Sequence, residues 1–312
     1  MSAGFRERVR KCVSAVAVFE KEPLAPYTTF QVGGPADFLV DIASVDELWC
    51  VLAAAREPEV PVTLLGGGSN VVVSDEGIPG VVLRLRMNGI SMPEPGVVRA
   101  EASATMNGLV RWTIGRGLSA LEAWAGTPGT VGGAIYGNAH YGGRDIGDLV
   151  LQVLLATRDG ELVTVPASAM EFDYDSSRLQ RTREILVWAE FATTTGAPDE
   201  LRGVARASLA HRKRTQPLAL PSAGCMFQNP VPGREVLPDG VPYSAGALID
   251  RAGLKGHRIG GAEISGVHAN FFVNTGGATA RDIKQLTETA RAAVRDRFGI
   301  VLRDEVVFLG HF

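Results

Sequence analysis

Short runs of apolar residues alternate with longer amphipathic segments along this chain, a pattern that is typical of a mixed α/β protein. The apolar runs predict strands at residues 38–42, 62–65, 71–73, 81–85, 149–155, 161–165, 186–191, 262–264, 271–273 and 301–309. The amphipathic segments predict helices at residues 45–56, 105–116, 202–214 and 244–254, and one more that starts near residue 278. Since a strand, a helix and a strand follow one another between residues 38 and 65, we expect a β-α-β unit there.

The helix near residue 278 has the most regular pattern. Its apolar positions are spaced by three and four residues, at Ile283, Leu286, Ala290, Ala293, Val294 and Phe298. Gly299 is expected to end it, and Gly117 to end the helix at 105–116, because glycine readily adopts the left-handed conformation found at helix C-termini. Asp159-Gly160 lies between two apolar runs and predicts a hairpin turn.

A linker is predicted at residues 193–198, which read Thr-Thr-Thr-Gly-Ala-Pro. We therefore place a domain boundary after this stretch. The basic segment from Arg202 to Arg214 follows it and is expected to form a surface helix.

Composition narrows the classes of function. The chain has 312 residues, of which 46% are hydrophobic, and this is ample for the cores of a soluble protein with two or three modules. Its net charge of -3 argues against a nucleic-acid-binding or membrane-surface protein, which usually carries a basic excess. The N-terminus is too densely charged for a signal peptide, so the mature protein is expected to begin near Met1. Nothing requires an oligomer, and a monomer is expected.

The cysteines and histidines indicate no metal site. Cys12, Cys50 and Cys225 are odd in number, widely spaced and outside any C-x-x-C pair, so they predict neither a disulfide framework nor a zinc site. The five histidines are scattered without metal-ligand spacing. These features fit a reducing cytoplasm.

Two glycine-rich segments carry the strongest candidate chemistry. One runs from Gly126 to Gly143 as GTPGTVGGAIYGNAHYGG, and the other reads LGGGSN from Leu65. Glycine lets the backbone approach a ligand closely, so consecutive N–H groups can point at phosphate oxygens. Neither segment fits the G-x-G-x-x-G or P-loop motif. We expect them to form two walls of one pocket for a pyrophosphate, and tight turns without a ligand are the alternative.

Several strings appear in a characteristic order along the chain. They are TTFQVGGPA from Thr28, LGGGSN from Leu65, GTPGTVGGA from Gly126, PSAGCMFQNP from Pro221, AGALID from Ala245, AGLKG from Ala252 and VHANF from Val267. Their order resembles that of the UDP-N-acetylenolpyruvoylglucosamine reductases, over about residues 27–309. The compact run from Gly224 to Gly261 resembles the shorter form of that family.

This resemblance implies an α/β (α+β) fold, in which an FAD-binding fold of two subdomains precedes a third, smaller α/β substrate-binding domain. The subdomains would be residues 1–83, to which a C-terminal strand at 301–312 returns, and residues 84–199, and the substrate domain residues 200–300. The implied protein is a cytoplasmic flavoenzyme of bacterial peptidoglycan synthesis. It would use FAD and NADPH to reduce UDP-N-acetylglucosamine enolpyruvate, a UDP-sugar, to UDP-N-acetylmuramate.

The resemblance also assigns site residues. Cys225 takes the position of the family's proton-donating serine, and Glu305 that of its catalytic glutamate. Asn229 and Lys255 would contact the substrate. The residues expected to bind FAD are Gly66, Gly67, Gly68, Ser69, Asn70, Gly126, Thr127, Gly129, Thr130, Gly132, Gly133, Asn138 and Tyr174. No metal is expected.

One departure from the family pattern bears on activity. The family's catalytic arginine lies in F-x-Y-R-x-S, and the corresponding residue in FDYDSS is Asp175. A carboxylate that faces a developing negative charge raises the barrier, so this reversal favours an alternative in which the chain binds FAD but is catalytically impaired. Arg178 and Arg181 are candidates to replace the arginine. Further departures are Gln228, Val307 and His140.

Simpler interpretations remain open for single residues. Cys225 is alternatively a small buried hydrophobe, and Glu305 a solvated carboxylate at a strand end. Lys255 is alternatively a side chain that extends from a helix end to solvent. His268 is expected to be structural rather than a catalytic base. A flavin oxidase or dehydrogenase with another substrate is a third interpretation of the whole chain, which the AGLKG and HANF strings disfavour.

Overall fold

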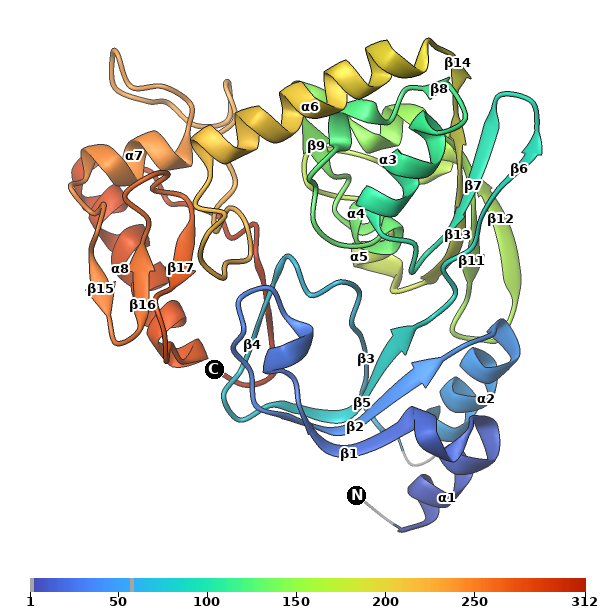
Figure 1. The fold of residues 1–312 in the computed structure, drawn as a ribbon. Helices are drawn as coiled ribbons and strands as arrows, with labels where there is room; N and C mark the ends of the chain where they lie inside the picture. The colour runs from blue at the N-terminus through green and yellow to red at the C-terminus, as the bar shows by residue number, and fades with distance from the viewer. Residues whose placement is uncertain (1–2, 57–58) are drawn as a thin grey trace. The chain divides into compact units, whose positions relative to one another are not determined.

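The computed structural model describes residues 3–56 and 59–312 (Figure 1). The chain divides into two compact units. The first is formed by the described residues of Met1–Glu20, Phe38–Gly67 and Gly80–His211, and the second by Lys21–Asp37, Gly68–Pro79 and Arg212–Phe312. Among the helices of the described residues, none combines the length and the apolar character that crossing a membrane requires.

A four-stranded sheet in the order β1-β2-β5-β3 contributes to the first unit. Its strands span Val18–Pro23, Pro35–Ile42, Ile78–Leu85 and Val62–Leu64, respectively. Helix α2 (Val45–Arg56) connects β2 to β3, as the sequence predicts, and its first turn is capped by Ser44 Oγ, which accepts the N–H of Glu47 at 3.2 Å. In the sheet, β5 lies between β2 and β3, and β3 pairs with β5 in parallel.

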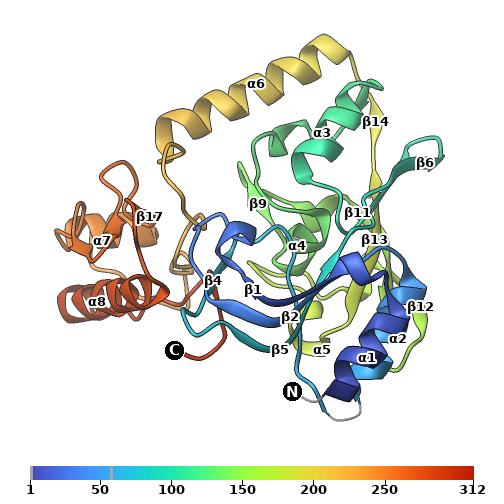
Figure 2. The same ribbon diagram turned by 60° about the horizontal axis from the view of Figure 1, so that its bottom comes forward.

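A five-stranded sheet forms the centre of the first unit, in the order β12-β11-β13-β7-β6. Its strands span Leu162–Pro166, Val150–Ala156, Ile185–Ala192, Val97–Glu101 and Ile90–Glu94, and all neighbours are antiparallel. Helices α3 (Met106–Ile114), α4 (Val131–Tyr136) and α5 (Leu179–Thr182) lie beside this sheet in both views (Figures 1 and 2). Two short ladders, β8 (Leu118–Ser119) with β14 (Thr194–Thr195) and β9 (His140–Tyr141) with β10 (Arg144–Asp145), complete the strands of this unit.

The linker predicted at 193–198 leads into helix α6 (Pro198–Thr215), which covers the predicted basic helix. The division between the two units falls within α6, after His211. Short 3-10 helices occupy Ala15–Ala17, Ala25–Tyr27, Glu122–Trp124, Ile146–Leu149 and Ala167–Ala169. The division into domains at residues 83 and 199 stays a prediction.

The second unit combines two small sheets with helices α7 (Ala245–Arg251) and α8 (Ala280–Phe298). Strands β15 (Arg258–Ile259), β16 (Ala262–Ile264) and β17 (Phe272–Asn274) form an antiparallel sheet, and β4 (Val71–Val73) pairs in parallel with β18 (Val307–Leu309). Helix α8 buries the predicted apolar face, with Ile283, Leu286, Ala290 and Val294 fully inaccessible. It ends where predicted, at Gly299, whose φ of 72° is left-handed.

Several predicted elements differ in extent from the structure, among them the helix predicted at 244–254, which ends at Arg251. The last strand spans only Val307–Leu309 because residues 303–305 form hydrogen bonds with residues 226–228 instead. The helix predicted at 105–116 ends at Ile114, where Gly115 is its C-cap. The strand predicted at 81–85 begins earlier, at Ile78, as β5. The sequence pattern did not predict strands β1, β6 and β7 or helices α1, α4 and α5. Short or charge-rich segments give only a weak hydrophobic periodicity.

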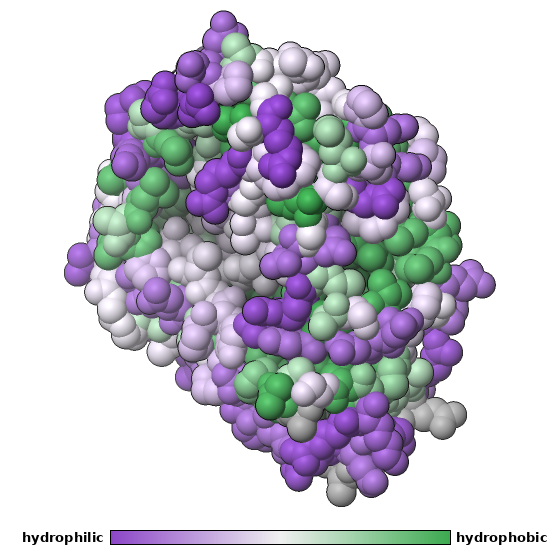
Figure 3. All heavy atoms as spheres, turned by 45° about the vertical axis from the view of Figure 1, so that its right-hand side comes forward, coloured by the Kyte–Doolittle hydropathy of each residue, from purple (hydrophilic) through white to green (hydrophobic). Residues whose placement is uncertain are grey.

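Helix α1 (Ala3–Cys12) lies next to α2 in Figures 1 and 2. Its buried face includes Phe5 and Val9, and the ring of Phe5 meets that of Phe38 edge to face at 5.6 Å. Charged residues occupy positions 6–8, 10 and 11 of α1. Hydrophilic side chains gather over the lower part of the face drawn in Figure 3, where α1 and α2 lie.

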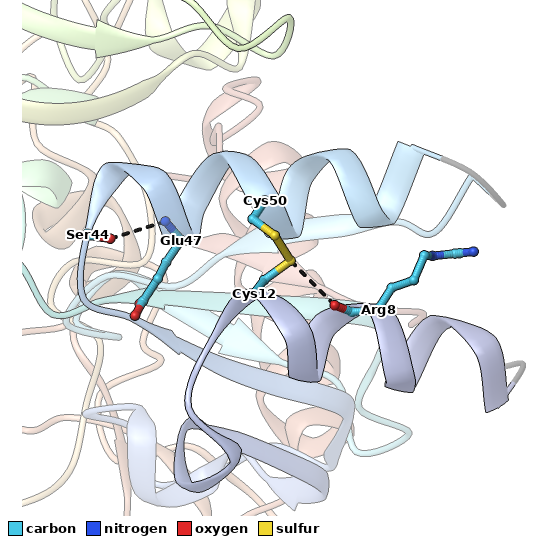
Figure 4. The surroundings of a disulfide bond; sticks show 5 residues. All are labelled: Arg8, Cys12, Ser44, Glu47 and Cys50. Atoms are coloured by element: carbon cyan, nitrogen blue, oxygen red, sulfur yellow. Dashed lines mark hydrogen bonds between the residues drawn. A yellow bond between two sulfur atoms is a disulfide. The ribbon is translucent and has the colours of Figure 1, made fainter.

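The prediction that no disulfide forms is wrong, because Cys12 and Cys50 are joined (Figure 4). Cys12 is the last residue of α1 and Cys50 lies in the middle of α2, and the two Cα atoms are 5.3 Å apart. Spacing along the sequence did not reveal the bond, since residues 38 apart meet only after α1 has packed on α2. Cys225 keeps its thiol.

Candidate active site

The two glycine-rich segments meet in the first unit, as the sequence predicts. A Cβ atom on Gly67 would lie 2.7 Å from Cα of Gly129, and one on Gly66 would lie 3.1 Å from Oγ1 of Thr130. Any residue other than glycine at position 67 would therefore force the two loops apart. Backbone contact at this distance explains why glycine is needed here, independently of any positive φ.

Three backbone amides of these loops have no acceptor within the described part of the chain. Among the residues that the structure describes, the backbone N–H groups of Gly66, Gly67 and Gly129 donate to no protein atom. Asn107 fixes the second loop, since its Oδ1 accepts the N–H of Gly126 at 2.7 Å. Unpaired amides on adjacent glycine loops suit the oxygens of a pyrophosphate, so the residues present fit FAD.

Thr130 is the N-cap of α4, and its Oγ1 accepts the N–H of Gly133 at 3.3 Å. The expected cofactor residues Gly132 and Gly133 therefore lie in the first turn of this helix. Its six residues are too few to form a strong dipole on their own. Any ligand binding here depends on the glycine-loop amides.

Asn138 has a structural role that the sequence did not show. Its side chain is 2% exposed and bridges two segments: Nδ2 donates to the carbonyl of Asp173 at 3.0 Å, and Oδ1 accepts the N–H of Gly147 at 3.0 Å. It thereby ties the loop after α4 to the turn that carries Tyr174. The predicted contact between Asn138 and FAD stays a prediction.

Asp175, which replaces the family's arginine, lies against His140. Its Oδ1 is 3.1 Å from Nδ1 of His140, and its side chain is 10% exposed. The ring of His140 also lies 5.4 Å from that of Tyr174. Arg178 and Arg181 pair with other carboxylates, those of Glu184 at 2.9 Å and Glu171 at 2.7 Å. The side chain that lies against Asp175 is therefore a histidine rather than either arginine.

The remainder of the LGGGSN loop belongs to the second unit. Gly68 has a φ of 63°, and a Cβ there would lie 2.0 Å from the carbonyl oxygen of Tyr27. The N–H of Thr29 donates to the carbonyl of Gly68 at 2.9 Å. Asn70 extends the loop toward the C-terminal segment, because its Nδ2 donates to the carbonyl of Glu305 at 3.0 Å.

Cys225 and Glu305, the two predicted catalytic residues, lie on adjoining segments of the second unit. The N–H of Glu305 donates to the carbonyl of Met226 at 2.9 Å, and Phe227 and Asp304 form a β-bridge. Cys225 forms a second bridge with Phe271 on its other side. The segment that begins at Cys225 is thus held between the HANF string and the C-terminal segment.

Two residues that complete this arrangement escaped the sequence analysis. Asn270 is 2% exposed, and its side chain accepts the N–H of Phe227 at 3.0 Å and donates to the carbonyl of the same residue at 2.7 Å. Arg291 pairs with Asp304 at 2.6 Å, next to Glu305. In the sequence, only the polar character of Asn270 within the HANF string indicated a role for that residue. Arg291 lies on α8 outside any motif, so the sequence did not indicate it.

The predicted substrate-binding residues lie near the two ends of α7. Asn229 Oδ1 accepts the N–H of Ala245, the first residue of the helix, at 2.9 Å. Lys255 lies beyond the other end and pairs with Asp250 at 2.8 Å. Burial, together with the charge of Lys255, lowers the pKa of His268, and its Nδ1 accepts the N–H of Asn270 at 3.2 Å. His268 is therefore a neutral residue that stabilises the loop, in keeping with the structural interpretation.

In the described part of the chain, no group of three or more histidine, cysteine or carboxylate side chains could hold a metal ion.

The fold and the paired glycine loops define an FAD-dependent oxidoreductase, and an FAD-binding domain model matches residues 36–166. A model of the UDP-N-acetylenolpyruvoylglucosamine reductase C-terminal domain matches residues 216–309. The chain belongs to the UDP-N-acetylenolpyruvoylglucosamine reductase family and carries that family's reductase activity in peptidoglycan precursor synthesis. The fold class and the family inferred from the sequence are thereby confirmed.

Relatives cover nearly the whole chain. UDP-N-acetylenolpyruvoylglucosamine reductase 2 of Symbiobacterium thermophilum is 41% identical over 93% of this chain and 91% of the relative. The reductase of Carboxydothermus hydrogenoformans is 38% identical over 99% of both chains. The crystal structure of the reductase from Thermus caldophilus superposes with a TM-score of 0.77 at 32% identity, and the match covers 94% of this chain and 98% of that one.

Proposed function

We propose that this chain reduces the enolpyruvyl double bond of UDP-N-acetylglucosamine enolpyruvate with a hydride that originates from NADPH and a proton that the protein supplies. The substrate, NADPH and one proton become UDP-N-acetylmuramate and NADP⁺, so atoms and charge balance. The observation that carries this proposal is the placement of Cys225 and Glu305 on adjoining backbone segments of the second unit.

Cys225 is the proposed proton donor. Addition of hydride to the β-carbon leaves enolate-like charge on the α-carbon and carboxylate of the substrate, and a donor within hydrogen-bond reach must then protonate the α-carbon. The reference pKa of a thiol is about 8.5, far below that of an alcohol, so a thiol gives up its proton more readily than the family's serine. We assign Glu305 to orienting the substrate for this transfer.

The glycine loops are the proposed FAD site, in which the amides of Gly66, Gly67 and Gly129 receive the pyrophosphate. When bound, FAD supplies a two-electron carrier that accepts hydride from one nucleotide and donates it to the other. The protein's task is to bind both nucleotides and to exclude water. We further propose that Asn229 and Lys255 contact the UDP-sugar.

A second candidate function is a relative that binds FAD but is catalytically impaired, and Asp175 favours it. Losing a positive charge aimed at a developing oxyanion typically costs about 3 kcal/mol of transition-state stabilisation. Against this candidate, Asp175 lies within hydrogen-bonding distance of His140, so its carboxylate is already engaged.

We also propose that the enzyme acts in the cytoplasm as a monomer. The location follows from the nucleotide substrate and the NADPH donor rather than from the cysteines, because the Cys12–Cys50 disulfide no longer supports a reducing compartment. Light scattering during gel filtration should give a mass near 33.1 kDa for the apoprotein.

The decisive experiment is anaerobic stopped-flow absorbance of the FAD-loaded protein. It is reduced with NADPH and then mixed with UDP-N-acetylglucosamine enolpyruvate in deuterated water. Rapid reoxidation of the flavin, with deuterium incorporated at the α-carbon of the product, establishes the reductase. Loss of this deuterium incorporation in Cys225→Ala identifies the thiol as the proton donor. Reduction by NADPH without reoxidation by this substrate would leave only the impaired relative.

A further inference from the structure

The C-terminal segment changes its pairing partner at Glu305. Ahead of this residue, the segment runs beside residues 226–228, and the N–H of Gln228 donates to the carbonyl of Arg303 at 2.9 Å. Beyond it, β18 pairs in parallel with β4. Glu305 therefore lies at a junction between two sets of backbone pairs.

A β-bulge occupies this junction. The N–H groups of Glu305 and Val306 both donate to the carbonyl of Met226, at 2.9 and 3.4 Å, so two residues of one segment face a single residue of the other. Bulges redirect side chains and are frequent beside active sites. A shift of the pairing by one residue would turn the carboxylate to the opposite face. A contact that fixes the register just ahead of the bulge would therefore fix the position of Glu305.

Arg291 of α8 supplies such a contact. Its Nη1 donates to the carbonyl of Leu302, and its Nη2 donates to Oδ1 of Asp304 at 2.6 Å. Its Nε donates to Oε2 of Glu288 at 3.2 Å, so all three nitrogens are engaged. Because a guanidinium is planar and donates in fixed directions, Arg291 holds Leu302 and Asp304 in one relative position.

The same guanidinium contacts the opposite segment. Its central carbon lies 5.3 Å from the ring centroid of Phe227, within the range of a cation–π contact. Phe227 is fully buried and forms a β-bridge with Asp304. Arg291 therefore spans both segments next to the bulge, at Asp304, which precedes Glu305, and at Phe227, which follows Cys225 by two residues.

We propose that Arg291 is a positioning residue for the reductase reaction, because its contacts with Asp304 and Phe227 fix the bulge that directs Glu305. In this role it acts through Glu305 and not on the reacting atoms. The proposal rests on the proposed function for the role of Glu305, and on the hydrogen bonds above for the bulge.

A double-mutant cycle tests whether Arg291 acts through Glu305. The limiting rate constant for reoxidation by the UDP-sugar is measured by stopped flow for the native enzyme, Arg291→Met, Glu305→Ala and the double variant. We expect Arg291→Met to lower this rate constant by about 10- to 100-fold, the effect of misplacing a group by about 1 Å. In the Glu305→Ala background the same replacement should cost less than about twofold, because the group that it positions is gone.

Two further variants accompany the cycle. Arg291→Lys keeps the positive charge beside Asp304 but has one nitrogen in place of three, so it should restore only part of the rate. It also takes the place of Arg291→Met in the cycle if the methionine variant does not fold. Glu288→Gln is the matched control, since it changes a half-exposed partner of Arg291 on the same helix, and it should leave the rate unchanged.

Hydrogen exchange of the FAD-loaded protein tests the bulge without reference to activity. The amides of Glu305 and Val306 should exchange at least about tenfold faster in Arg291→Met, while those of β16 and β17 stay as in the native protein. Native exchange at the bulge would overturn the proposal. So would a native rate of reoxidation in Arg291→Met, or an equal loss of rate in the native and Glu305→Ala backgrounds. Failure of the native protein to reoxidise with the UDP-sugar would instead refute the proposed function, while the exchange measurement still tests Arg291.

Discussion

The backbone N–H of Glu305 donates to the carbonyl of Met226 over 2.9 Å, although the two residues are far apart in the sequence. Through this bond the residue after Cys225 is joined directly to Glu305. Two side chains that the sequence separates therefore emerge from neighbouring backbone positions.

Replacing Cys225 tests the role of its thiol. We expect Cys225→Ala to slow the reoxidation of the reduced enzyme by the UDP-sugar by about 10² to 10⁴, the usual contribution of a general acid, and to leave reduction by NADPH unchanged. Cys225→Ser should retain most of the activity, because a hydroxyl can donate from the same position. Equal reoxidation rates for alanine and serine variants would argue against proton donation by residue 225.

Asn270→Ala tests what holds the segment after Cys225. Both hydrogen bonds to Phe227 are lost, and the backbone N–H and carbonyl of that residue become buried without partners. The expected loss in unfolding free energy is about 2 to 5 kcal/mol by urea denaturation. Asn270→Asp should be similarly unstable at neutral pH since a carboxylate cannot donate, and native-like stability for this variant would contradict the assignment.

Gly67→Ala tests the contact between the glycine loops. The new methyl group would lie 2.7 Å from Cα of Gly129, so we expect the loops to separate and the FAD content of the purified protein, measured by absorbance, to fall at least tenfold. Gly203→Ala is the control: it lies in helix α6 with open space around it, and it should raise stability by up to about 1 kcal/mol. Full FAD content in Gly67→Ala would show that the loops can accommodate the methyl group without losing FAD.

Breaking the Cys12–Cys50 disulfide tests its contribution to stability. The bond closes a loop over a separation of 38 residues, and the chain-entropy model assigns such a loop about 4 kcal/mol. Double replacement by serine should lower the unfolding free energy by about that amount. A reducing agent should lower the stability of the native protein and leave that of the double variant unchanged. Insensitivity of the native protein to reduction would mean that the bond is not formed in solution.

His268 should make stability depend on pH. Its pKa is lowered in the folded state by burial and by Lys255, whereas the unfolded chain takes up a proton below about pH 6.5. The unfolded state then binds more protons, so stability is lost as the pH falls from about 6.5 toward the folded-state pKa. Urea denaturation between pH 7.5 and 5.5 should show a smaller loss for His268→Gln than for the native protein. An equal loss of stability in the two proteins would exclude His268 as a source of the pH dependence.

Local sequence predicted much of the fold. Helix α2 has the predicted bounds, and α8 buries most of its predicted apolar face, because helical periodicity and capping residues act over one or two turns. The hairpin predicted from Asp159-Gly160 likewise forms between β11 and β12, with a turn that the N–H of Thr157 closes by donating to the carbonyl of Glu161. The glycine loops were identified as partners because both carry residues that permit close backbone approach.

The sequence by itself determined the family, the main helices and strands and the residue types of the candidate site, since these follow from local pattern and motif order. Tertiary structure alone decided that Cys12 meets Cys50, that Asp175 lies against His140 and that Asn270 holds Phe227. Each of these contacts joins segments that are distant in sequence or lie on separate turns. Their energy arises only when packing excludes water and brings the atoms within about 3 Å, so no local pattern records them.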